Sequence, residues 1–94
     1  MQAVTHVYYV AITLGYWGRG SSEQAAIKAC RKAGWNGKHD RLIIYRNCYE
    51  GIYKSAEEDK PTVNSYGMIF FNGRISKIAV YEKGARSKRR EIVE

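Results

Sequence analysis

The dipeptide Asn72-Gly73 constrains the fold of this chain more than any other feature, because it lies between two segments with the composition of β-strands. Residues 66–71 read YGMIFF and residues 74–81 read RISKIAVY, so β-branched and aromatic side chains dominate both segments. A two-residue hairpin turn needs a positive φ at both central positions, which Asn and Gly tolerate. The sequence therefore predicts a β-hairpin over residues 66–81.

The same turn predicts which side chains share a face of the hairpin. Phe70 is expected opposite Ile75, and Ile69 opposite Ser76. One face then gathers Tyr66, Met68, Phe70, Ile75, Ala79 and Tyr81. Since the other face is apolar too, either the sheet is covered on both sides or one face binds a partner. Under the second alternative the candidate interface residues are Tyr66, Met68, Phe70 and Tyr81.

A first strand is predicted near the N-terminus. Even-numbered positions in residues 4–16 are mostly apolar or aromatic, and this period of two is typical of a strand. Residues 18–20, which read GRG, are expected to end the strand. Ser21, with Gln24 three residues later, has the pattern of a helix N-cap, so a helix is expected to begin there.

An amphipathic helix is predicted over residues 22–33, and Gly34 is its expected stop. Its apolar stripe consists of Ala26, Ile27, Cys30 and Ala33. Three cations, Lys28, Arg31 and Lys32, lie on the other side of the helix. We therefore expect the helix to pack on a sheet and to present a basic face.

The remaining body of the chain completes an α+β arrangement. Residues 42–45, which read LIIY, predict a buried strand, whereas residues 47–64 have no clear assignment apart from an acidic loop over residues 55–62. The fold class is α+β: one amphipathic helix packed on a mainly antiparallel sheet of about four strands, in the order strand, helix, strand, unassigned segment, strand, strand. Residues 1–82 form the single domain, and residues 83–94 a flexible, basic C-terminal tail.

Charge points to a polyanionic partner. The formal net charge is +7, and both the body and the tail contribute to it. Such a balance attracts nucleic acid or an acidic protein surface, although it says nothing about fold. The candidate nucleic-acid-binding residues are Arg19, Lys28, Arg31, Lys32, Lys38, Arg41, Lys83, Arg86, Lys88, Arg89 and Arg90.

Residues 18–22, which read GRGSS, offer a more local hypothesis. A glycine-rich turn from a strand into a helix N-terminus can hold a phosphate through backbone N–H groups, and Arg19 would add a bidentate contact. The stretch lacks the lysine of a P-loop and the GxGxxG spacing, and such a turn often uses glycine for geometry alone.

Catalytic and metal-binding groupings are not evident in the sequence. The only histidines are His6 and His39, and Cys30 and Cys48 match neither a redox pair nor a zinc-ligand spacing. We expect no metal and no cofactor. Both cysteines are expected to be reduced and buried, which favours the cytoplasm, and residues 7–17 form too short an apolar stretch to cross a bilayer.

The leading hypothesis is a small, non-enzymatic, cytoplasmic protein that binds nucleic acid or another polyanionic surface through its helix face and tail. The alternative is a protein-interaction module or homodimer that uses a tyrosine-rich sheet face, such as a small accessory or inhibitor protein of a phage or mobile element. A third hypothesis is a small metal-independent ribonuclease, since phosphate cleavage needs mainly charge stabilisation and one proton-transfer group.

Overall fold

The computed structural model describes residues 4–37, 40–51, 62–63, 65, 69–70 and 73–92. Its elements follow the order β1 (Val4–Thr13), β2 (Tyr16–Gly20), α1 (Glu23–Lys32), β3 (Leu42–Gly51), β4 (Thr62–Val63), β5 (Ile69–Phe70), β6 (Arg74–Tyr81) and β7 (Arg89–Glu91).

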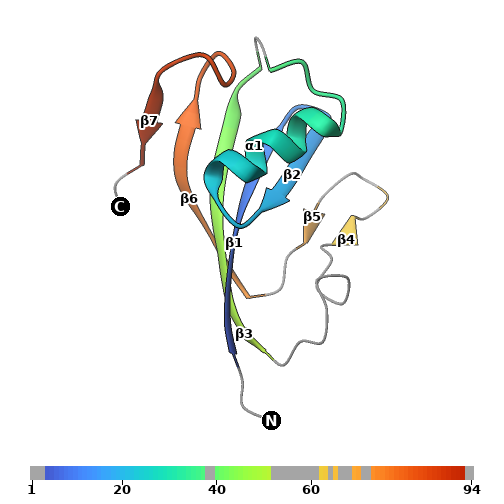
Figure 1. Ribbon diagram of the computed structural model, residues 1–94, viewed down its shortest axis with the longest axis vertical. Coiled ribbons are helices and arrows are strands. Elements are labelled where there is room, and N and C mark those ends of the chain that lie inside the picture. Colours follow the sequence, from blue (N-terminus) through green and yellow to red (C-terminus); the bar gives the residue numbers. More distant parts are fainter. Residues whose placement is uncertain are drawn as a thin grey trace.

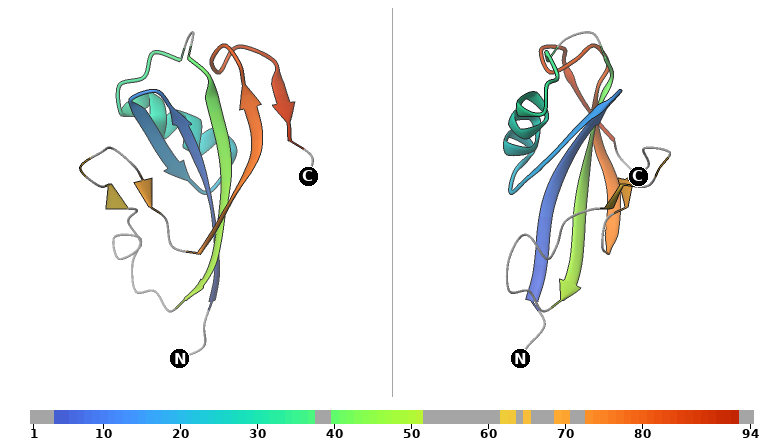
Figure 2. Two further views of the ribbon diagram at one scale, coloured as in Figure 1. Left: turned by 180° about the vertical axis from the view of Figure 1, so that it is seen from behind. Right: turned by 90° about the vertical axis from the view of Figure 1, so that its right-hand side faces the viewer.

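One antiparallel sheet organises the molecule, and its strand order is β2-β1-β3-β6-β7 (Figure 1). Helix α1 covers one face of this sheet, over β1 and β2 (Figure 2). The short strands β4 and β5 pair with each other as a separate ladder. The predicted α+β class is confirmed, with five strands in the main sheet where about four were expected.

The predicted first strand is in fact a hairpin. Strand β1 ends at Thr13, and β2 returns antiparallel to it with Tyr16 opposite Thr13. Gly15 has a φ of 82°, which suits its place in the turn, and the side chain of Leu14 is 82% exposed. The sequence did not reveal this turn, because the apolar Leu14 and the aromatic Tyr16 continue the strand pattern.

Strand β6 forms as predicted, but its partners differ from the prediction. Gly73 has a positive φ of 74°, as a turn there requires. However, β5 pairs with β4, placing Phe70 opposite Thr62, and β6 pairs with β3, placing Ile75 opposite Asn47. The predicted Phe70–Ile75 pairing is therefore wrong. Strand β1 occupies one edge of β3, and the other edge of this 10-residue strand pairs with β6, whereas β5 has only 2 residues to offer.

Helix α1 begins one residue later than predicted. Ser22, and not Ser21, is the N-cap, and its hydroxyl accepts a hydrogen bond of 3.1 Å from the backbone N–H of Ala25. Ala26, Ile27 and Cys30 are buried as expected, whereas Ala33 is exposed.

The core lies between α1 and the sheet. It consists of Ala11, Ala26, Ile27, Cys30, Trp35, Leu42, Ile44, Ala79 and Tyr81. On β2, Gly18 and Gly20 face the helix, and a Cβ on Gly18 would lie 2.2 Å from the backbone nitrogen of Cys30. Because Gly18 and Gly20 have no side chain, the backbone of α1 can approach β2 closely.

The C-terminal segment belongs to the sheet over residues 89–91. Strand β7 pairs with β6, and the N–H of Ile92 donates to the carbonyl of Ile78 at 2.9 Å. The N–H of Ala85 donates to the carbonyl of Gly37 at 3.1 Å, which attaches the β6–β7 connection to the loop after α1. Residues 83–92 are therefore attached to the sheet and to the loop after α1, and they do not form the separate tail that was predicted to begin at residue 83.

Candidate nucleic-acid interface

A groove lies between α1 and the connection from β6 to β7. Its volume is about 430 Å³, and it is lined by Gln24, Ile27, Lys28, Arg31, Tyr81 and Ala85. We call it the helix groove. Because Lys28 and Arg31 are three residues apart on α1, they lie on one side of the helix, above the groove.

The cations of the helix groove are available to a ligand. Lys28 and Arg31 are exposed, and neither forms an ion pair with any part of the chain that the structure describes. Arg31 also has a defined neighbour, since a Cβ on Gly37 would lie 3.0 Å from its Nη2 and 3.1 Å from its Cζ. The guanidinium therefore rests against the backbone of the same loop that holds Ala85.

A polar cluster anchors β6 and β7 to the start of α1. The Tyr81 hydroxyl donates a hydrogen bond of 2.8 Å to Oε2 of Glu23, and Nε of Arg89 donates to the same oxygen at 2.9 Å. Nη2 of Arg89 donates to Oε1 of Glu23 at 3.0 Å, so the pair is bidentate.

The pKa values of this cluster follow from burial and from these bonds. Burial alone would raise the pKa of Glu23, but the hydrogen bonds from Arg89 and Tyr81 outweigh it and hold the pKa below its usual value. Burial, together with the neighbouring Glu23 carboxylate, raises the pKa of Tyr81 to about 12. Glu23 is thus a carboxylate at neutral pH that already binds Arg89.

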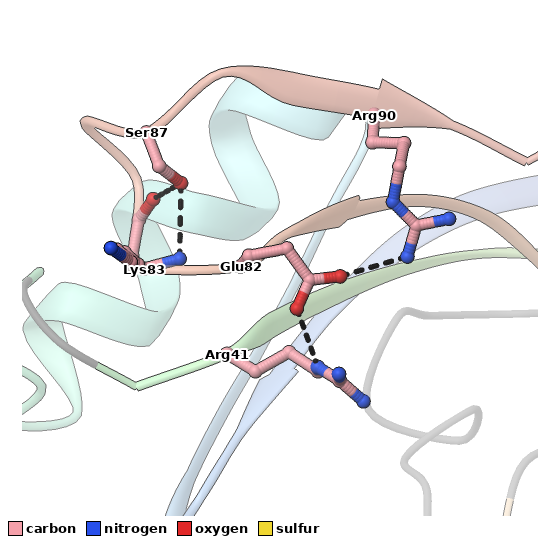
Figure 3. Close-up of polar contacts among 6 residues, drawn as sticks. Arg41, Glu82, Lys83, Ser87 and Arg90 are labelled. Carbon is pink, nitrogen blue, oxygen red and sulfur yellow. Dashed lines mark hydrogen bonds and ion pairs between the residues drawn. The ribbon is translucent and has the colours of Figure 1, made fainter.

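A second groove lies along the β6–β7 connection. Its volume is about 420 Å³, and it is lined by Glu82, Lys83, Ser87, Lys88, Arg89 and Arg90. We call it the turn groove. Ser87 shapes the connection, because its hydroxyl accepts from the N–H of Lys83 at 3.2 Å and donates to the carbonyl of Gly84 at 2.6 Å (Figure 3).

Glu82 binds two of the predicted cations at this end of the sheet. Nε of Arg41 lies 3.0 Å from one carboxylate oxygen of Glu82, and Nη2 of Arg90 lies 2.8 Å from the other (Figure 3). These hydrogen bonds, chiefly that from Arg90, lower the pKa of Glu82. Because Tyr81 faces α1, its neighbour Glu82 lies on the opposite side of the sheet, together with Arg90.

The structure brings most of the predicted cations to one end of the molecule. Lys28 and Arg31 line the helix groove, and the turn groove is lined by Lys83, Lys88, Arg89 and Arg90. Lys32 is exposed on α1, Arg86 is exposed in the β6–β7 connection, and Arg41 binds Glu82. Lys38 lies outside the described residues.

Arg19 does not join this set. Gly18 and Gly20 face α1, so Arg19 between them faces the other side of the sheet, where its guanidinium carbon lies 4.5 Å from the centroid of the Tyr8 ring. The glycines of residues 18–20 are in a strand and provide room for the helix. The predicted phosphate turn is thereby corrected, and Glu23 already places a carboxylate at this helix N-terminus.

The predicted aromatic interface is not assembled in the described residues. Tyr81 is 6% exposed and belongs to the core, so it offers little surface to a partner. The Phe70 backbone lies in β5, whereas Tyr66 and Met68 lie outside the described residues. Both cysteines are free thiols, as predicted, but only Cys30 is buried and Cys48 is half-buried.

The sequence reasoning missed the two acidic residues that position the site. Glu23 and Glu82 were not singled out, although an acidic residue in a first helical turn is a recognisable signal. Glu82 carries no comparable local signal. Within the described ranges, no group of three potential metal ligands is present, and α1 is too short and too polar to span a bilayer.

Comparisons of the chain with protein-family models, curated protein sequences and solved structures found no match.

Proposed function

We propose that this protein binds nucleic acid without catalysing a reaction, and that it contacts phosphates through the helix groove and the β6–β7 connection. The main observation behind this proposal is that Lys28 and Arg31 of α1 line the same groove as Ala85 of the β6–β7 connection. Phosphate oxygens accept hydrogen bonds from such side chains, and an arginine held in place loses less freedom on binding.

The distribution of carboxylates supports the proposal. Glu23 is bound by Arg89, and Glu82 is bound by Arg41 and Arg90. Lys28, Arg31, Lys83 and Lys88 form no ion pair with the described residues, so an incoming phosphate would not have to displace a carboxylate from them. The net charge of +7 adds long-range attraction to a polyanion.

Binding of this kind reads the backbone and not the base sequence, because phosphates carry no sequence information. Both cysteines are free thiols, which supports a reducing compartment, such as the cytoplasm, as the place where the protein acts.

The proposal is tested by fluorescence anisotropy with labelled single-stranded DNA, single-stranded RNA and duplex DNA over a range of salt concentrations. We expect binding at low salt, with log K falling linearly as log salt rises, by roughly 0.7 per phosphate contacted on a single strand. Sequences of equal length should bind with similar affinity. Absence of binding to all three nucleic acids at low salt would refute the proposal.

A further inference from the structure

The helix groove and the turn groove lie at the same end of the sheet and share one structural element. Tyr81 and Ala85 of the β6–β7 segment line the first groove, and Lys83, Ser87 and Lys88 line the second. The first groove also contains the cations Lys28 and Arg31. The connection between β6 and β7 lies between the two grooves.

We propose that the two grooves form one bipartite site for a single-stranded nucleic acid, whose backbone crosses over the β6–β7 connection from one groove to the other. This inference rests on the proposed function and names the form of nucleic acid. Arg86 is exposed within the connection, directly after Ala85 of the helix groove and before Ser87 of the turn groove. A strand that crosses the connection therefore meets a cation at each stage of its path.

The positions of the grooves favour a flexible ligand. The helix groove borders α1, whereas the turn groove extends from Arg89, which faces α1, to Glu82 and Arg90 on the side of the sheet away from α1 (Figure 3). A ligand in contact with both must bend around a single hairpin connection. Duplex DNA has a persistence length of about 50 nm and resists so tight a bend. A single strand bends freely.

Two separate grooves also favour a ligand with repeated phosphates. A single phosphate would occupy one groove, whereas a strand that occupies both gains from the high effective concentration of its second segment. The turn itself is well defined, because Ser87 bonds to both Lys83 and Gly84, and Ala85 bonds to Gly37. Hydrogen bonds therefore define the shape of the connection that lies between the two grooves.

The experiment measures the affinity of oligothymidylate strands of about 4 and about 16 nucleotides, the range of site sizes known for single-strand binders, and of a duplex as long as the longer strand. Three double variants are compared. Lys28→Gln/Arg31→Gln removes two cations of the helix groove, and Lys83→Gln/Lys88→Gln removes two of the turn groove. Arg74→Gln/Lys77→Gln is the control, because both residues are exposed and line neither groove.

We expect each groove variant to weaken binding of the long strand by about tenfold or more, since a charge-assisted contact contributes on that scale. The control variant should bind within about twofold of the unmodified protein. The long strand should also bind more tightly than the duplex at equal salt. Circular dichroism and thermal melting of each variant show that the fold is retained.

Two results would overturn the inference while nucleic-acid binding at the helix groove still stands: a turn-groove variant that binds the long strand as tightly as the control does, or a duplex that binds as tightly as the long strand. If no strand and no duplex binds even at low salt, the proposed function fails and the bipartite site fails with it.

Discussion

The hydroxyl of Tyr81 donates a hydrogen bond of 2.8 Å to the carboxylate of Glu23 and thereby joins the end of β6 to the first turn of α1. Arg89 of β7 binds the same carboxylate. The Glu23 side chain thus connects α1 with β6 and β7, which are more distant in the sequence, and α1 and Tyr81 of β6 also line the helix groove.

The first prediction concerns acid stability. The folded state holds the pKa of Glu23 below its usual value of 4.5, so the stabilisation is present above that value and is lost as pH falls through the lower folded pKa. Glu23→Gln should lower the free energy of unfolding by about 1 kcal/mol at neutral pH and flatten its fall below pH 4.5. Urea unfolding at several pH values measures both effects. If the free energy of unfolding of Glu23→Gln falls below pH 4.5 as steeply as that of the unmodified protein, the hydrogen bonds to Glu23 do not stabilise the fold.

The second prediction concerns Tyr81 at alkaline pH. Since its pKa is raised to about 12, the stabilisation is complete below the usual value of 10.0 and is lost as pH rises through 12. A titration followed by tyrosinate absorbance should contain a component with a midpoint near pH 12, and Tyr81→Phe should remove it. Persistence of that component in Tyr81→Phe would assign it to another tyrosine.

The third prediction concerns the packing of α1 on β2. In Gly18→Ala the new Cβ would lie 2.2 Å from the nitrogen of Cys30 and 2.6 Å from the oxygen of Ala26, so the helix must move. We expect a loss of about 3 kcal/mol or more, measured by thermal or urea unfolding.

Gly15→Ala is the matched control for that loss. Gly15 has a φ of 82°, but a Cβ at this position would have no atom within 4 Å, so only backbone strain of about 1 kcal/mol is expected. Equal losses in the two variants would mean that close packing at Gly18 is not the cause.

The fourth prediction concerns thiol reactivity. Burial raises the pKa of Cys30 to about 11, and its side chain has no exposed surface, whereas Cys48 is half-buried. In Cys48→Ser, labelling with a thiol reagent at neutral pH should proceed only as fast as the protein opens. Mild denaturant should accelerate it. Immediate labelling of this variant in the native state would contradict the burial of Cys30.

Local signals in the sequence were sufficient to predict α1. The stripe of Ala26, Ile27 and Cys30 has helical spacing, and a serine precedes it, so periodicity and capping both indicate the helix. The positive φ of Gly73 was also predicted correctly, since a glycine needs no distant partner to adopt it.

Features that depend on contacts distant in sequence were not predictable. The basic composition of β7 gives no strand signal, but its alternating side chains reach Glu23 from Arg89 and Glu82 from Arg90, on the two sides of the sheet. Likewise, β6 pairs with β3 and not with β5. Ala85 lines the helix groove and is bonded to Gly37, a contact between distant residues, so the sequence predicted the cations of the groove and not their assembly.

The most direct test of the central claim compares the salt dependence of single-strand binding in Lys28→Gln/Arg31→Gln and in Arg74→Gln/Lys77→Gln. Both variants lose one lysine and one arginine, so the net charge changes equally, but only the first pair lines the helix groove. We predict that the first variant lowers the slope of log K against log salt by roughly 1.4, for two lost phosphate contacts, and that the second leaves the slope nearly unchanged. Equal slopes in the two variants would show that binding follows net charge alone and would contradict the assignment of the groove.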